Sequence, residues 1–163
     1  MSEGRTARLA FDGVTDGDAA FILELLNDPG WLANIGDRGV RTLDDTRTYI
    51  AERFNNGHWL VVRNGSTAEP LGLCGIVPTR LGLDLPDLGY AILARHSGKG
   101  YATEAAAALL ARALGPLGHP RLAAFTSLAN LASQRVLEKI GFRRLGVRRL
   151  LGHVDDSAYF ETP

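Results

Sequence analysis

The sequence lacks the features that mark secreted, membrane-spanning and nucleic-acid-binding proteins. Its single cysteine, Cys74, cannot form an internal disulfide, as is typical of a reducing compartment. The longest apolar run, residues 105–111, is far shorter than the roughly 20 residues that a membrane span needs, and the polar N-terminus has no apolar signal-peptide core. Basic and acidic residues both number 18, so the formal net charge is zero. We therefore expect a cytoplasmic protein without nucleic-acid or membrane partners.

A metal site is not expected either. The four histidines are dispersed along the chain, and no group of histidine and cysteine residues has the spacing of metal ligands. Cys74 lies within an apolar segment, which indicates a small buried residue.

What the sequence does contain is the composition of one folded domain. Its 163 residues are 45% hydrophobic and 22% charged, which is ordinary for a globular chain. A chain of this length buries roughly 70% of its unfolded surface. Glycine is frequent, at 19 residues without a collagen period, which indicates tight turns. We expect a single domain over residues 1–163.

The expected elements alternate irregularly between strands and helices. Strands are predicted for residues 6–11, 58–63, 71–78, 88–93, 121–126, 142–151 and 154–161, and helices for residues 18–26, 43–55, 101–114 and 131–140. Residues 31–40 are expected to be irregular. This mixed order favours an α+β or three-layer α/β sheet over a doubly wound one.

A glycine-rich segment between a predicted strand and a predicted helix is the strongest local feature. Gly98 and Gly100 flank Lys99, one of two lysines in the chain. The glycines allow a tight turn, and the helix that follows offers free N–H groups and a partial positive charge to an anion. The dinucleotide and P-loop motifs are both absent. The alternative is an ordinary strand-to-helix turn.

Asn130 and Ser133 form the second feature. Asn130 precedes a predicted helix and Ser133 lies one turn into it, so both polar side chains are expected on one side of the helix start. The alternative is that Asn130 is simply an N-cap residue.

Together the two features resemble the GNAT superfamily of acyl-CoA-dependent N-acetyltransferases, in the branch named for ribosomal-protein alanine acetyltransferases (the RimJ/RimL type). The resemblance covers nearly the whole chain, and its segments follow the family's order. These segments are residues 6–9, 27–31, 35–38, 88–90, 98–105 and 130–142. The last two are the most specific.

The resemblance implies an α/β fold with a mostly antiparallel sheet of six or seven strands, helices on both sides and two splayed central parallel strands. Acetyl-CoA is implied between those strands. Its pyrophosphate would lie on the backbone N–H groups of Gly98, Lys99, Gly100, Tyr101, Ala102 and Thr103. Its pantetheine arm would pair with Ala91, Ile92 and Leu93. Asn130 would bind the arm, and Ser133 would lie near the sulfur.

The implied reaction is direct acetyl transfer from the thioester to a primary amine in a ternary complex. Asp87 is the best candidate for the base, since it precedes the strand that would border the thioester; Asp84, His58 and His96 are further candidates. Asp87 is equally compatible with a solvated loop acid. Ser133 would donate a hydrogen bond to the leaving thiolate.

The acceptor pocket is expected to involve Trp31 and Arg38, where the arginine would hold a carboxylate or carbonyl. Core packing is the alternative for Trp31. The acceptor is either a protein N-terminus or a small amine, and a non-catalytic acyl-CoA-binding module is the competing hypothesis. The oligomeric state is open, with a homodimer as one possibility.

Overall fold

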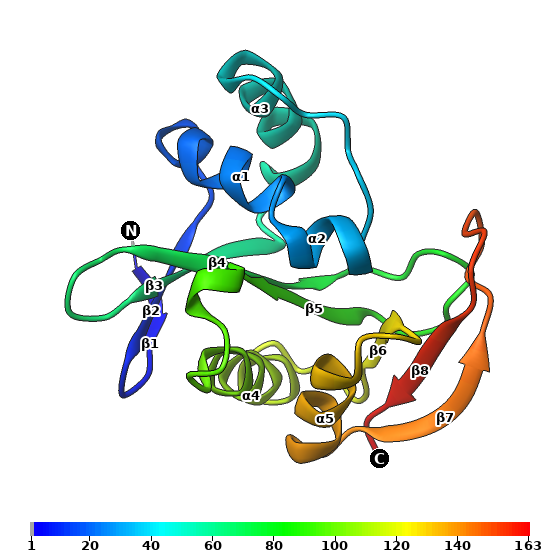
Figure 1. The fold of residues 1–163 in the computed structure, drawn as a ribbon. Coiled ribbons are helices and arrows are strands. Elements are labelled where there is room, and N and C mark those ends of the chain that lie inside the picture. The colour runs from blue at the N-terminus through cyan, green and yellow to red at the C-terminus, as the bar shows by residue number, and fades with distance from the viewer. Residues whose placement is uncertain (1) are drawn as a thin grey trace.

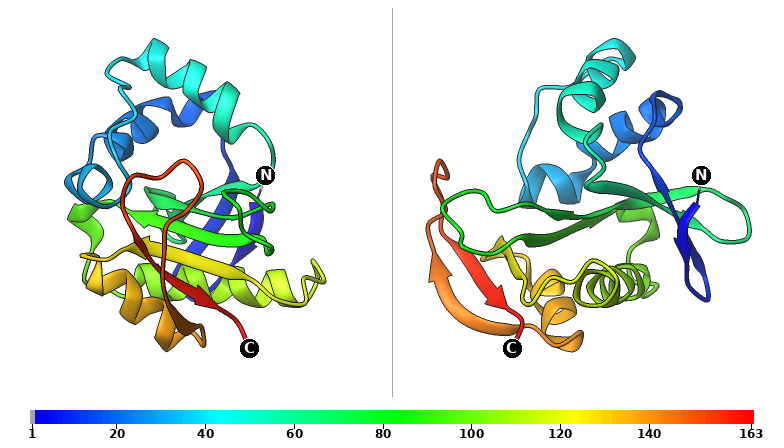
Figure 2. Two further views of the ribbon diagram at one scale, coloured as in Figure 1. Left: turned by 90° about the vertical axis from the view of Figure 1, so that its right-hand side faces the viewer. Right: turned by 180° about the vertical axis from the view of Figure 1, so that it is seen from behind.

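A mixed sheet of eight strands separates two layers of helices (Figure 1). The structure is a computed structural model and describes residues 2–163. Helices α1, α2 and α3 cover one face of the sheet, and α4 and α5 cover the other, as the views in Figure 2 also show. The strands are β1 (Ser2–Arg5), β2 (Leu9–Gly13), β3 (Trp59–Asn64), β4 (Pro70–Val77), β5 (Asp87–Ile92), β6 (Ala123–Ser127), β7 (Arg143–Arg148) and β8 (Ser157–Glu161).

Four helices lie at predicted positions, and the fifth, α2, was not predicted. The five helices are α1 (Ala19–Leu26), α2 (Pro29–Asn34), α3 (Leu43–Tyr49), α4 (Tyr101–Leu114) and α5 (Leu131–Lys139), with short helical turns η1 (Asp16–Asp18), η2 (Ile50–Phe54) and η3 (Ala94–His96). A capping box begins α3, where the Thr42 side chain accepts from the Asp45 N–H at 3.0 Å.

Two parts of the chain differ from the prediction. Residues 2–5 form an additional strand, so the sheet has eight strands instead of six or seven, because the chain turns back where the Thr6 N–H donates to the Leu9 carbonyl. Residues 29–34 are helical instead of irregular. Asp28 accepts from the Gly30 N–H as an N-cap and Pro29 occupies the first turn, so the residues that end α1 also begin α2.

Each face of the sheet has its own hydrophobic core. On one side Ala105, Ala106 and Ala113 of α4 are fully buried, and these small residues let the helix lie close against the sheet. On the other side residues of α1 and η2 pack with Trp31, Val61 and Leu93. The sheet is therefore buried on both faces around β4 and β5.

The strand order is β1-β2-β3-β4-β5-β6-β8-β7. All neighbouring pairs are antiparallel except β5 and β6, which are parallel. Within the described residues, β5 and β6 pair at a single position, Asp87 opposite Ala123. The two strands therefore part after their first residues, as the resemblance implied.

Gly72 lets β4 approach β5 closely. A Cβ atom added at Gly72 would lie 2.1 Å from the Ala91 carbonyl oxygen and 2.7 Å from the Ile92 Cδ1 atom. The oxygen belongs to the backbone of β5, which cannot move aside without breaking the pairing. Gly72 therefore fixes the position of β5.

We expect Gly72→Ala to lower the free energy of unfolding by about 1–3 kcal/mol or more, because the added methyl overpacks two paired strands. Gly13→Ala is the matched control: Gly13 ends β2, and a Cβ there meets nothing within 4 Å. Urea unfolding curves measure both. Equal midpoints for the two variants would show that the close approach does not constrain the sheet.

Candidate active site

The glycine-rich loop lies between β5 and α4, as predicted. Gly98 and Gly100 have φ angles of +75° and +81°, a backbone region that favours glycine, and Gly100 is the N-cap of α4. Residues 97–100 are exposed. Ser97 turns away from the loop opening, since its hydroxyl donates to the Ala94 carbonyl at 2.6 Å.

This loop fits an anion. A Cβ atom at Gly98 would meet nothing within 4 Å, so there is open space beside it. The N–H groups of residues 101–103 belong to the first turn of a 14-residue helix and have no intrahelical acceptor. Among the described residues the Lys99 ammonium has no hydrogen-bond partner. Free N–H groups, the helix dipole and one lysine together suit a diphosphate.

The edge of β5 that faces β6 presents backbone groups where the two strands part. The Leu93 N–H donates to the Leu71 carbonyl of the β4 side at 2.9 Å. Because hydrogen bonding alternates along an antiparallel strand, the backbone groups of Ala91 also face β4, and those of Tyr90 and Ile92 face β6. Of the three residues expected to pair with an extended ligand, Ile92 therefore has the suitable orientation, and Tyr90 joins it.

Asn130 and Ser133 lie at the start of α5, on the other side of this opening. The Asn130 side-chain oxygen accepts from the Ser133 N–H at 3.2 Å, so Asn130 is an N-cap, as the alternative interpretation expected. In the described part of the chain the Asn130 amide nitrogen has no partner. Asn130 thus caps the helix with one atom and keeps a donor for a ligand.

Tyr90 and Ser133 form a hydroxyl pair that the sequence reasoning missed. The Tyr90 hydroxyl lies 2.7 Å from Ser133 Oγ and donates to the Ser133 carbonyl oxygen at 3.1 Å. Burial raises the pKa of Tyr90 to about 12, so the phenol stays protonated at neutral pH. The segment 88–90 was part of the resemblance, but no local pattern pairs Tyr90 with a helix 43 residues further on.

Asp87 lies at the point where β5 and β6 meet. It is 1% exposed, and both carboxylate oxygens accept from the Arg80 guanidinium, at 2.9 and 3.0 Å. Arg80 in turn lies over the Phe125 ring, 5.7 Å from its centroid. With both oxygens occupied and buried, the carboxylate is placed to hold the β4–β5 loop instead of meeting an amine.

Helix α2 spans the ends of the two parted strands. Asp28, just before α2, accepts from the Ala94 N–H after β5 at 3.1 and 3.2 Å. At the other end of the helix, the Ser127 hydroxyl of β6 donates to the Asn34 side chain at 2.7 Å. The rise of a six-residue helix is about 9 Å, roughly twice the ~4.8 Å between paired strands. α2 therefore holds β5 and β6 apart.

The predicted acceptor residues lie on α2 and just after it. Trp31 is 8% exposed and packs in the core, but its indole N–H finds no acceptor within residues 2–163. Arg38 is exposed between Gly36 and Gly39, which have φ angles of +125° and +71°. Its guanidinium has no hydrogen-bond or ion-pair partner in the described chain. Both residues thus have unused donors.

Of the remaining base candidates, Asp84 is exposed, His58 is half-buried, and His96 has a surface contact. His96 Nε2 lies 3.2 Å from a Glu69 carboxylate oxygen, on the surface beside the loop. Cys74 is fully buried, and this burial raises its pKa to about 12, so it is a packing residue as expected. Within residues 2–163 no group of three or more His, Cys, Asp or Glu side chains is placed to hold a metal ion. No helix in this part of the chain is long and apolar enough to cross a membrane.

Comparison with known proteins identifies the family. The model of the acetyltransferase (GNAT) domain matches residues 8–143. The chain is 34% identical over 143 residues to the uncharacterized protein YkkB of Bacillus subtilis, covering 83% of this chain and 82% of that protein.

Solved structures share the fold over nearly the whole chain. A GNAT-family acetyltransferase from Bacillus anthracis superposes with a TM-score of 0.82 at 25% identity, over 99% of this chain and 97% of that one. RimL, a ribosomal L7/L12 α-N-protein acetyltransferase in complex with CoA, has a TM-score of 0.81 at 15% identity, over 99% and 97%. A Vibrio cholerae spermidine N-acetyltransferase with CoA and spermine has a TM-score of 0.78 at 17% identity, over 96% and 95%.

The family model matches residues 8–143, and the fold has the parted strands β5 and β6 and a glycine-rich loop before α4. The chain therefore belongs to the GNAT family of acetyltransferases.

Proposed function

We propose that this acetyltransferase moves the acetyl group of acetyl-CoA directly to a primary amine in a ternary complex. The observation that carries the proposal is the opening between β5 and β6, which has the anion-fitting start of α4 at its side and α2 across its end. When bound, acetyl-CoA supplies an activated acyl group as a thioester. Binding the donor and stabilising the developing charges fall to residues of the chain.

The binding residues follow from the donors that the fold leaves available. The N–H groups of residues 98–103 and the Lys99 ammonium would hold the pyrophosphate. The backbone of Tyr90 and Ile92 would pair with the pantetheine arm like an added strand, and the Asn130 amide would donate to it. Ala91 and Leu93 support this edge through their pairing with β4.

The same groups can stabilise the charges that develop during transfer. A β5 backbone N–H directed toward β6 is a donor for the oxyanion of the tetrahedral intermediate. The Ser133 hydroxyl is a donor for the leaving thiolate. The Tyr90 hydroxyl can donate either to the Ser133 carbonyl oxygen or to Ser133 Oγ. It can therefore donate to Oγ when the serine hydroxyl turns toward the thioester sulfur of the bound donor.

The amine must be neutral when it attacks the thioester, and Asp87 is poorly placed to take its proton because both of its oxygens already accept from Arg80. An α-amino group has a pKa of about 8, whereas an alkylamine such as a lysine side chain has about 10.4. Near pH 7 roughly a tenth of such an α-amine is already neutral, against less than about a thousandth of an alkylamine, so an α-amine depends less on a protein base. We propose an α-amine acceptor, a peptide N-terminus or an amino acid, whose carbonyl or carboxylate is bound by Arg38 beside Trp31.

The competing function is a module that binds acyl-CoA without catalysis. Such a module would need the glycine loop and Asn130, but it would not need a hydroxyl pair near the expected position of the thioester sulfur. The 2.7 Å contact between Tyr90 and Ser133 favours catalysis. The cytoplasm remains the proposed place of action, on the strength of the single buried cysteine.

The test is release of free CoA thiol from acetyl-CoA with a panel of amines. The panel contains peptides with free N-termini, amino acids, polyamines and a control without acceptor. The proposal predicts release with peptides or amino acids. Release with polyamines alone would contradict the α-amine acceptor. Binding of acetyl-CoA without release by any amine would favour the non-catalytic module.

Gly100→Ala should raise the KM for acetyl-CoA by tenfold or more, because its φ of +81° is strained for alanine and the loop would move its N–H groups. Gly118→Ala is the control, since Gly118 has a similar φ of +69° in the turn after α4. It should lose similar stability, on the order of 1 kcal/mol, and keep its KM. Equal KM values for both variants would contradict the assignment of the loop.

Ser133→Ala should lower kcat by about tenfold or more with little change in the KM for acetyl-CoA, since it removes a donor that acts on the developing thiolate. Tyr90→Phe should lower kcat less. The double variant should match Ser133→Ala alone, because Tyr90 acts through Ser133. Steady-state kinetics of all three variants measure this coupling, and fully additive losses would show that the two hydroxyls act independently.

Arg38→Gln should raise the KM for an α-amine acceptor by about tenfold, the loss of one charge-assisted hydrogen bond. Its stability and its KM for acetyl-CoA should be unchanged, since its guanidinium has no partner in the described chain. Arg53→Gln, which removes another exposed arginine side chain on the same face of the sheet, is the control. An unchanged acceptor KM in both variants would remove Arg38 from the site.

A further inference from the structure

We infer that Arg8, in the turn between β1 and β2, is a positioning residue that sets the direction of the Gly100 N–H in the phosphate loop. The inference rests on the proposed function and adds a part of the chain that lies about ninety residues from the loop. The glycine motif itself gives no indication of Arg8.

The contacts of Arg8 converge on the loop and the first turn of α4. Its Nη1 donates to the Lys99 carbonyl oxygen at 2.9 Å, and its Nε donates to Glu104 Oε2 at 2.7 Å. Its own backbone N–H and the Thr6 hydroxyl both donate to Glu104 Oε1, at 3.0 and 2.5 Å. The guanidinium lies over the Tyr101 ring, 4.7 Å from the centroid. The β1–β2 turn is thus fastened to the start of α4.

The bond to Lys99 fixes a peptide plane. In a trans peptide the carbonyl oxygen and the next N–H point in opposite directions. Because Arg8 holds the Lys99 oxygen, the Gly100 N–H must point away from Arg8, toward the opposite side of the loop. Gly100, on one side of this peptide, otherwise restricts its rotation less than a residue with a side chain would. Arg8 therefore preorganises a donor that the glycines alone would not orient.

The bond to Glu104 removes an electrostatic conflict. A carboxylate in the first turn of α4 suits the helix dipole but repels a bound phosphate. Burial raises the pKa of Glu104, and the hydrogen bonds from Thr6 and Arg8 outweigh it and lower the pKa, so the carboxylate is ionised at neutral pH. The Arg8 charge compensates it at 2.7 Å. Gly100 preserves the room for this arrangement, since a Cβ there would lie 3.2 Å from Arg8 Nη2.

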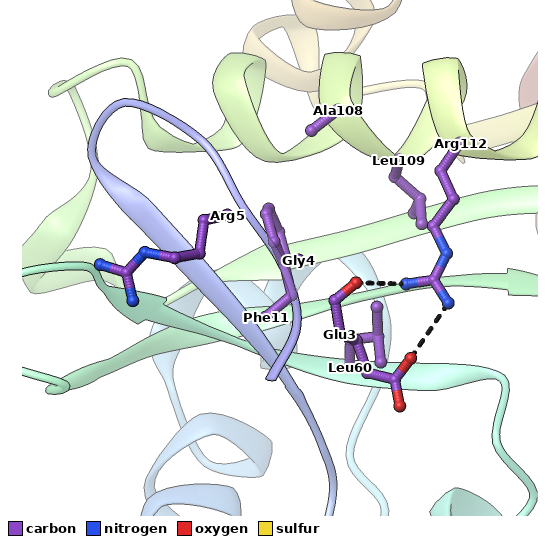
Figure 3. A pocket seen from close by; sticks show the side chains of 8 residues that line it. All are labelled: Glu3, Gly4, Arg5, Phe11, Leu60, Ala108, Leu109 and Arg112. Atoms are coloured by element: carbon purple, nitrogen blue, oxygen red, sulfur yellow. Dashed lines mark hydrogen bonds and ion pairs between the residues drawn. The ribbon is translucent and has the colours of Figure 1, made fainter. Parts of the chain in front are cut away.

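A second arginine joins the same hairpin to the same helix at a different place. Figure 3 shows Arg112 of α4 donating to the backbone oxygen and the carboxylate of Glu3 in β1, both at 3.1 Å. The contact borders a hollow between the hairpin and the C-terminal half of α4. Arg112 therefore has the same fastening role as Arg8 without a contact to the phosphate loop, which makes it a matched control.

The experiment is calorimetric titration of wild type, Arg8→Gln, Arg8→Lys and Arg112→Gln with CoA, alongside thermal unfolding and turnover of S-acetyl-pantetheine, which lacks the pyrophosphate. We expect Arg8→Gln to weaken CoA binding by about tenfold or more, and Arg112→Gln to stay within twofold of wild type at a similar loss of stability. Arg8→Lys keeps the charge but loses the several N–H donors of the guanidinium, so its CoA binding should remain at least fivefold weaker than that of wild type. The kcat/KM for S-acetyl-pantetheine should be unchanged in Arg8→Gln.

Three results overturn the inference. The first is CoA binding by Arg8→Gln within twofold of wild type. The second is an equal loss of CoA affinity in Arg8→Gln and Arg112→Gln, which would mean that Arg8 acts only by holding the β1–β2 hairpin against α4. The third is a loss of kcat/KM for S-acetyl-pantetheine in Arg8→Gln that is as large as the loss of CoA affinity in the same variant. Failure of the wild type itself to bind CoA is a separate outcome, which would overturn the proposed function and this inference with it.

Discussion

Two parallel strands that part after one paired position leave backbone donors and acceptors facing the space between them, and such groups are costly to leave without partners. In this protein the opening between β5 and β6 is held by side chains from three directions. Asp87 and Arg80 hold the closed end, α2 spans the open end, and α5 flanks the side. The groups proposed to bind the ligand are consequences of this geometry, since a continuous β5–β6 ladder would use their donors and acceptors.

A buried glutamine helps to hold α5 in position. Gln134 donates to the carbonyl oxygens of Ser127 and Leu128 at the end of β6, at 3.3 and 3.0 Å, and accepts from Arg144 of β7. One side chain thus ties the helix to two strands and brings Ser133 toward Tyr90. The hydroxyl pair is therefore supported from both sides of the opening, which is what a site needs to hold its donors in place before a ligand arrives.

Local signals explain which elements could be predicted from the sequence. Residues 101–114 were predicted as a helix with the observed bounds, because a glycine turn, an alanine-rich run and a terminal glycine mark them. The mixed sheet and the family could be predicted because residues 98–105 and 130–142 form recognisable motifs. Helix α2 was missed because its Asp-Pro-Gly start has the same signals as the end of α1.

Long-range pairs explain what could not be predicted. Asp87 was singled out for its place before the predicted strand 88–93, but its partner Arg80 became visible only in the fold. Tyr90 with Ser133, and Arg8 with Lys99 and Glu104, are separated by 43 and more than 90 residues, and no periodicity in the sequence links them. Residues of the motifs could be identified, whereas the side chains that orient them depend on tertiary contacts.

The most direct test of the account is hydrogen exchange of individual backbone amides with and without CoA. In the free protein the amides of residues 98–103 and those of Tyr90 and Ile92 should exchange quickly, because the helix start and the parted strand leave them without acceptors. The account predicts that CoA protects these two groups together and leaves the β7–β8 hairpin unchanged. Protection that spares residues 98–103 while CoA is bound would contradict it.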